Sequence, residues 1–177
     1  KANYYSMKRL FQTFVETQLR KTQREHVEEL LKLMEQQGYY KVDSTRHHRW
    51  EGGTLQHSLE VLLYALEHNT HGIPEDSIVV TCLLHDLCNM QKHIRRHGCL
   101  SVELAKSAGF PLSREEYLAI RWHMHNESEK GTLGKNFDEV IDSKLWQLLR
   151  KADGHSAAHP MHRQEIVAKL IPILKKE

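Results

Sequence analysis

The segment LLHDLCNM, residues 83–90, places a histidine and an aspartate side by side in an otherwise apolar stretch. Burying an ionisable group costs several kcal/mol unless a partner compensates its charge. His85 and Asp86 would lie about 100° apart around a helix, so both side chains can be aimed at one ion. A metal ion is therefore a candidate partner for the pair.

Two more positions offer the same ligand types on other apolar segments. His57 follows GGTLQ and precedes the apolar run at residues 59–63, and Asp153 lies in LLRKADGHSA. Neutral imidazole and carboxylate suit a borderline or hard divalent ion, which makes Mn²⁺, Fe²⁺, Co²⁺, Ni²⁺, Zn²⁺ or Mg²⁺ the predicted cofactor. The three cysteines lack the paired short spacing of a structural zinc site.

The segments that must position these ligands are predicted to be helices, because apolar residues recur at helical spacing through most of the chain. Thr54 and Gly72 are the predicted caps of one helix, Ser113 and Glu116 form a capping-box pattern, and residues 126–138 are the long loop candidate. The predicted fold class is all-α. The expected helices cover residues 6–37 (as two helices or one bent helix), 54–72, 74–88, 100–109, 114–124, 138–157 and 163–176.

Composition argues against several classes of partner. At 177 residues the chain fits one domain, and its net charge of +2 gives no field strong enough to indicate nucleic acid or an anionic membrane. No run approaches the roughly 20 apolar residues of a membrane span, and the first residues do not resemble a signal peptide. An odd number of unpaired cysteines favours reduced thiols and a cytoplasmic location. The partner must therefore be inferred from the site itself.

The order of these residues resembles the HD-domain superfamily of metal-dependent phosphohydrolases, which is named after its His-Asp doublet. The segment HHRWEGGTLQHSLEV is similar to a lead-in common in that superfamily, and KADGHSA is similar to its closing ADxxSA. The resemblance covers roughly residues 45–158 and implies a single compact helical bundle with ligands from several helices. It divides the chain into an N-terminal helical segment, residues 1–44, that packs on an HD-domain core with a C-terminal helix, residues 45–177.

The resemblance also implies a second metal ion, because related proteins with two ions add one histidine after the doublet and another on the next helix. His97 and His123 stand at suitable positions, with Asp86 bridging the ions and His57 and Asp153 joining His85 on the first. His125 would face about 200° away from His123 on a helix, so His123 is preferred. His97 lies in a basic run, which in other proteins is often solvated or contacts an anion, so one ion and two ions both stay open.

The activity implied is hydrolysis of a phosphomonoester or phosphodiester, with a nucleotide as the favoured small-molecule substrate, by metal-activated water. His85 and Asp86 are the expected catalytic residues. His48, Lys92 and Arg96 are the expected substrate contacts.

Two alternatives to hydrolysis follow from the same residues. The di-iron oxygenase branch of the superfamily uses the same two additional histidines. A non-catalytic HD-fold domain is the other alternative, because HDLCN places Cys88 and Asn89 where many members have glycine and lysine. Nucleic acid stays possible but is not favoured, since the net charge is near zero. The sequence leaves the oligomeric state open.

Overall fold

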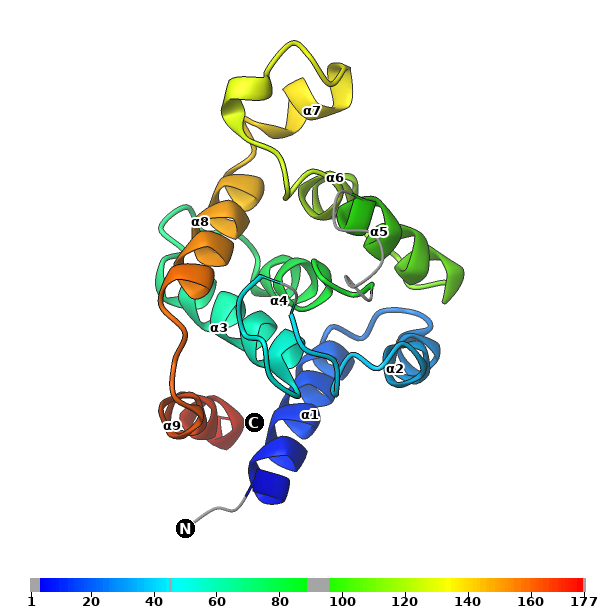
Figure 1. Ribbon diagram of the computed structural model, residues 1–177. Coiled ribbons are helices and arrows are strands. Elements are labelled where there is room, and N and C mark those ends of the chain that lie inside the picture. Colours follow the sequence, from blue (N-terminus) through cyan, green and yellow to red (C-terminus); the bar gives the residue numbers. More distant parts are fainter. Residues whose placement is uncertain (1–3, 45, 89–95, 177) are drawn as a thin grey trace.

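The computed structural model describes residues 4–44, 46–88 and 96–176, and within these ranges all regular structure is helical (Figure 1). The predicted all-α fold class is confirmed. None of the described helices is both long enough and apolar enough to cross a membrane. The elements are α1 (Tyr4–Lys21), α2 (Val27–Gln36), α3 (Gly53–Glu67), α4 (Glu75–Leu84), α5 (His97–Ser107), α6 (Arg114–Arg121), the short 3₁₀ helix η2 (Glu127–Glu129), α7 (Lys135–Val140), α8 (Lys144–Ala158) and α9 (Arg163–Lys175).

Helices α3 and α4 form the centre of the molecule, with α8 on one side and α5 and α6 on the other (Figure 1). Twelve of the fifteen residues of α3 are buried, and so is every residue of α4 from Ile78 to Leu84. A helix that is buried on nearly all sides has no solvent face for its polar residues. The polar side chains that α3 carries, such as His57 and Glu60, therefore need partners inside the protein.

Helix α5 approaches the end of α6 unusually closely at Gly98. A Cβ atom on Gly98 would lie 2.5 Å from the carbonyl oxygen of Arg121 and 2.7 Å from that of Ile120. Because real Cβ atoms do not come so close to backbone oxygens, this contact requires glycine. The approach brings the first residue of α5, His97, next to the residues that follow α6.

The capping predictions have mixed outcomes. Ser113 and Glu116 do form a capping box, with the Ser113 hydroxyl accepting from the Glu116 backbone N–H. The prediction that Thr54 caps α3 is wrong, because α3 starts one residue earlier and its N-cap is Gly52 at a φ of 78°. Thr54 instead donates its hydroxyl to the carbonyl oxygen of Asp43, at 3.3 Å, which ties the preceding loop to the helix.

Two helix boundaries also differ from the predicted ones. The single helix expected for residues 138–157 is two helices, because the Ser143 hydroxyl accepts the backbone N–H of Trp146 and so starts α8 separately from α7. The C-terminal end of α3 comes before Gly72 because Asn69 closes a turn with its side chain. That amide donates to the Ile73 carbonyl and accepts the Ile73 N–H, at 2.8 and 3.0 Å.

The N-terminal helices join the rest of the bundle through α1, which contacts α3, α4 and α9. The link between α1 and α2 adds a buried ion pair: Arg24 donates to both carboxylate oxygens of Glu116 on α6, at 2.6 and 2.8 Å. Ser77 on α4 donates to the same carboxylate at 2.7 Å. Three separate parts of the chain thus meet at one buried carboxylate, while the domain division at residue 44 stays a prediction.

Removal of the Arg24 guanidinium should strongly destabilise the protein. In Arg24→Met, the buried Glu116 carboxylate loses its charged partner, so we expect the free energy of unfolding at neutral pH to fall by about 3–5 kcal/mol. Urea unfolding measures this difference. The matched control is Arg20→Met, which removes an exposed ion pair with Glu28 and should cost at most about 1 kcal/mol. Equal effects for both variants would contradict the assignment of Arg24 as the charged partner of the buried Glu116 carboxylate.

The same variant should show a diagnostic pH dependence. Burial alone would raise the pKa of the Glu116 carboxyl, but the hydrogen bonds from Arg24 and Ser77 outweigh burial and lower it. Because the pKa is lower in the folded state, this group contributes stability above its ordinary pKa and loses that contribution as the pH falls through the folded value. The stability difference between wild type and Arg24→Met should therefore shrink in acid, where Glu116 is protonated in both proteins.

Candidate metal centre

The six side chains that the sequence nominated as ligands converge on one point in the interior. His57 projects from α3, and His85 and Asp86 follow directly after the last turn of α4. The remaining three are His97 at the first turn of α5, His123 just beyond α6 and Asp153 on α8. All except Asp153 are at least 97 % buried, and the side chain of Asp153 is 17 % exposed.

The imidazoles of His57 and His85 lie next to one carboxylate oxygen of Asp86, and Asp153 contacts both imidazoles. The Nε2 atom of His57 lies 2.9 Å from Oδ1 of Asp153 and 3.2 Å from Nε2 of His85. His85 Nε2 is in turn 3.2 Å from Oδ2 of Asp86. His57, His85 and Asp153 form the first group.

The other carboxylate oxygen of Asp86 faces a second group. Oδ1 lies 3.1 Å from Nε2 of His97 and 3.3 Å from Nε2 of His123. The two imidazole nitrogens are 2.9 Å apart. Asp86 therefore stands between the groups and offers one oxygen to each.

Backbone carbonyls fix the tautomers of two of these rings. Nδ1 of His85 lies 2.7 Å from the carbonyl oxygen of Cys82, and Nδ1 of His123 lies 2.6 Å from that of Ile120. A carbonyl oxygen can only accept, so each Nδ1 carries a hydrogen. In the neutral rings, the Nε2 lone pairs consequently point toward Asp86.

This arrangement fits a bound cation. In neutral His85 and His123, an Nε2 lone pair directed at the Asp86 carboxylate is repelled by it unless positive charge lies between them. Oδ1 of Asp86 is buried and makes no well-formed hydrogen bond within the described ranges, although two imidazole nitrogens lie within 3.3 Å of it; a metal ion between them would satisfy it. The donor set of imidazole and carboxylate matches the divalent ions predicted from the sequence.

Protons compete with a metal ion for the same atoms. Burial disfavours the charged form of His85, but the carboxylates of Asp86 and Asp153 outweigh it and raise its pKa well above the usual value. Burial likewise opposes ionisation of Asp86, yet the surrounding imidazoles hold the pKa of that carboxyl well below its usual range. Positive charge is thus favoured at this point, whether protons or a metal ion supply it.

A cavity of about 380 Å³ opens onto the two groups. This size is in the usual range for small-molecule sites. Two guanidinium groups reach its wall, from Arg46 before α3 and from Arg150 on α8. The lining residues are Ser44, Arg46, His47, Asp86, His97, Met124, Asn126, Arg150, Asp153, Gly154 and Ala157.

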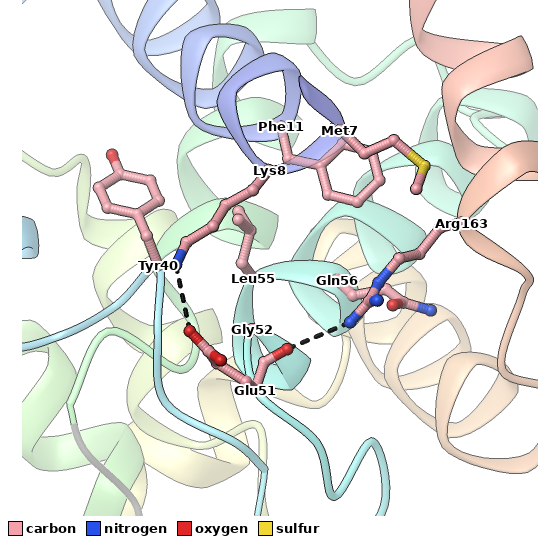
Figure 2. Close-up of a pocket in the computed structure, with 9 residues that line it drawn as sticks. All are labelled: Met7, Lys8, Phe11, Tyr40, Glu51, Gly52, Leu55, Gln56 and Arg163. Atoms are coloured by element: carbon pink, nitrogen blue, oxygen red, sulfur yellow. Dashed lines mark hydrogen bonds and ion pairs between the residues drawn. The ribbon is translucent and has the colours of Figure 1, made fainter. Parts of the chain in front are cut away.

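A second, much smaller hollow lies away from these groups, between α1, α3 and α9 (Figure 2). It holds about 20 Å³, roughly the space of one water molecule. Lys8 pairs with the Glu51 carboxylate at 3.2 Å across it, and Arg163 donates to the Glu51 carbonyl at 3.2 Å (Figure 2). These contacts tie the two terminal helices to the start of α3.

The expected substrate contacts fall in different places. His48 is only 2 % exposed, and its Nε2 lies 2.9 Å from a carboxylate oxygen of Glu60, inside the protein. Its neighbour His47 is the one that lines the cavity. Arg96 is exposed and does not belong to the described cavity wall. Lys92 lies outside the described residues.

Arg150 is a cavity residue that the sequence analysis missed. It donates to the carbonyl oxygen of His123 at 2.8 Å and to the side-chain oxygen of Asn126. Because Arg150 precedes Asp153 by three positions on α8, one helical turn places both on the same face. The three-residue spacing between Arg150 and Asp153 was the signal in the sequence that could have identified Arg150.

Comparison with known proteins agrees with the ligand order. The family model described as HD domain matches residues 54–171, about two thirds of the chain. The chain belongs to the HD domain family. The fold is thus that of a superfamily of metal-dependent hydrolases, and the matched residues run from the start of α3 into α9. Searches of curated proteins and of solved structures found no match.

Chelation should lower the melting temperature of this HD domain, because bound metal favours only the folded state. With metal at about 100 times its dissociation constant, the stabilisation lost is about 2.7 kcal/mol. Calorimetry before and after chelator treatment measures the shift, and metal analysis confirms removal. Asp86→Ala serves as the control, since its melting temperature should not respond to chelator. A wild-type melting curve that is unchanged after confirmed metal removal would argue against a site that joins the helices.

Proposed function

We propose that this HD domain is a metal-dependent phosphohydrolase that cleaves a small-molecule phosphate ester, with nucleotides as the favoured class. The observation that carries the proposal is the position of Asp86, which lines the cavity and offers one carboxylate oxygen to each imidazole group. A bridged pair of ligand groups under a cavity suits an in-line displacement between two ions.

Six residues would hold divalent ions in this proposal. One ion would lie with His57, His85 and Asp153, a second would lie with His97 and His123, and Asp86 would bridge them. Bound there, the ions would supply water activation at neutral pH and would neutralise charge on the phosphoryl oxygens. The buried ligands would keep the ions at the floor of the cavity.

Substrate orientation would depend on the cavity wall. Arg150 is held by the His123 carbonyl and by Asn126, so its guanidinium is preorganised and still has donors to spare for a phosphate. Arg46 is exposed at the mouth and adds a second positive charge. Ser44 also lines the cavity, and its buried hydroxyl has no hydrogen-bond partner in the described part of the chain. Two cations and a neutral donor together suit an anionic substrate.

The di-iron oxygenase alternative uses the same ligands, so geometry alone does not separate it from a hydrolase. Guanidinium groups on the wall favour a phosphate over an uncharged substrate, which supports the hydrolase. A non-catalytic domain would have no need for four buried imidazoles directed at one carboxylate. These observations support a hydrolase over an oxygenase and over a non-catalytic domain.

The test begins with metal analysis of protein purified without a histidine tag. The same protein is then assayed against phosphomonoesters and phosphodiesters, nucleotides first, with Mn²⁺, Co²⁺, Ni²⁺ and Mg²⁺. Metal-dependent release of phosphate or of a monoester is the expected result. Bound iron with oxygen consumption and no hydrolysis would establish the oxygenase instead.

Arg150→Met should raise the KM for the substrate by about 10- to 100-fold, because a charged hydrogen bond contributes about 1.5–3 kcal/mol. Steady-state kinetics measure the change, with bound metal checked to be the same as in wild type. Arg96→Met is the control, since Arg96 is exposed and lies outside the described cavity wall. A large effect from Arg96 and none from Arg150 would support the prediction from the sequence that Arg96 contacts the substrate.

A further inference from the structure

A carboxylate with no part in the proposed ligand set is buried on α3, one turn after His57. Glu60 is 3 % exposed and accepts three hydrogen bonds from described side chains. Ser156 donates to its Oε1 atom at 2.9 Å, and Gln56 and His48 lie 2.9 Å from its Oε2 atom. Because a buried charge is costly even when it is paired, we expect the Glu60 carboxylate to have a role beyond packing.

Ser156 connects this carboxylate to a proposed metal ligand. Nδ1 of His57 lies 2.9 Å from the Ser156 hydroxyl oxygen. That hydroxyl has a single hydrogen, which it donates to the Glu60 carboxylate, so it can only accept from His57. Nδ1 of His57 therefore carries a hydrogen, and the Nε2 lone pair points toward Asp153.

His57 differs in this respect from two of the other ligand histidines. Backbone carbonyls hold Nδ1 of His85 and His123, and no single substitution of a side chain can remove them. The orientation of His57 instead depends on two side chains from different helices. The first ligand group can therefore be perturbed selectively.

A second branch from the same carboxylate leads to the cavity wall. Since Glu60 can only accept, His48 must donate from Nε2, which leaves its Nδ1 as an acceptor when the ring is neutral. Nδ1 of His47 lies 2.8 Å away and donates to it. The His47 ring, which lines the cavity and lies 4.4 Å from the His57 ring centre to centre, is thereby fixed with Nε2 as its acceptor.

We propose that Glu60 and Ser156 are positioning residues, which hold His57 in the Nδ1–H tautomer that presents Nε2 to the first ligand group. This inference rests on the proposed metal site. A partner beyond the ligand shell raises the basicity of an imidazole and fixes its ring, and the loss of such a partner typically costs 10- to 100-fold in metal affinity. The same carboxylate orients His47 through His48.

The test is a Co²⁺ titration of the purified full chain, followed by visible absorption, for wild type, Ser156→Ala and Ser156→Thr. Ser156→Ala should bind one of its two ions about 10- to 100-fold more weakly and the other normally. Ser156→Thr keeps the hydroxyl and should restore the affinity. Ser58→Ala is the matched control, since it removes a buried hydroxyl next to His57 in sequence and should leave both affinities unchanged.

The tautomer itself is read from ¹H–¹⁵N spectra of the imidazole rings, independently of metal. Wild type should show His57 protonated at Nδ1, and Glu60→Gln should weaken that preference even if Ser156→Ala fails to fold. Protonation of wild-type His57 at Nε2 would overturn the inference. Two ions bound by Ser156→Ala with wild-type affinity would overturn it as well, while leaving the proposed function intact. A wild-type protein that binds no metal would contradict both this inference and the proposed function.

Discussion

Asp86→Ala should remove both of the proposed metal ions and lower the proposed hydrolytic activity by a factor on the order of 10³ or more. Asp86 offers one oxygen to each imidazole group, so its loss takes a ligand from both ions at once. The variant also leaves four imidazoles facing dications with less compensating charge. Bound metal per chain, measured on dialysed protein, should fall from about two to near zero.

The control for this variant is Asp142→Ala, which removes an exposed carboxylate outside the site. It should keep the metal content and activity of wild type. Full metal content in Asp86→Ala would mean that Asp86 is not a ligand. Loss of metal from both variants would indicate a general effect on folding.

His123→Ala should release only one ion. The first group, His57, His85 and Asp153, does not contain His123, so its ion should remain and bound metal should fall from about two to about one per chain. Activity should fall much further, by about 10²-fold or more, because one ion cannot stabilise both the attacking and the leaving oxygens. Metal analysis and initial rates on the same preparation measure the two effects.

His125→Ala is the comparison for this variant. The His125 side chain is 28 % exposed and lies 3.3 Å from the Glu129 carboxylate, away from Asp86. Its loss should be mild. If His125→Ala lost metal and His123→Ala did not, the choice between the two histidines would be wrong. If neither variant lost metal, the second group would not bind an ion.

The ligand residues could be nominated from the sequence because they come in a recognisable order on apolar helices. His85 and Asp86 are adjacent, and His57 and Asp153 each stand in an apolar helix where an unpaired polar group would be costly. His123 was preferred over His125 by helical geometry, although α6 ends at Arg121 and both histidines follow it. Here the helical argument selected the buried residue even though the helix had already ended.

Contacts across the fold were not readable in the same way. Ser156 and Glu60 are 96 positions apart, so their hydrogen bond depends on how α8 packs against α3. Local periodicity gives the face of each helix but not the register between two helices. Arg150 is a different case, because its spacing from Asp153 on α8 was a signal that the sequence did contain.

From the sequence we expect His48 to face the substrate, but His47 is the residue on the cavity wall, and this difference has a local cause. His48 adopts a φ of 49°, a conformation that is uncommon for residues with a side chain. In this conformation His48 turns inward to Glu60 while His47 faces the cavity. The sequence offers no residue there, such as glycine, that would signal a left-handed conformation.

The long separation between the ligands has a consequence for biosynthesis. His57 and Asp153 are 96 positions apart, and Asp153 comes from α8, so the first ligand group cannot assemble until α8 has been synthesised and has docked on α3. Closing so long a loop makes this docking a non-local step in folding, which carries a loop-closure entropy that contacts within one helix do not. A partly synthesised chain would therefore compete poorly for cellular metal, and ion capture would report the completion of folding.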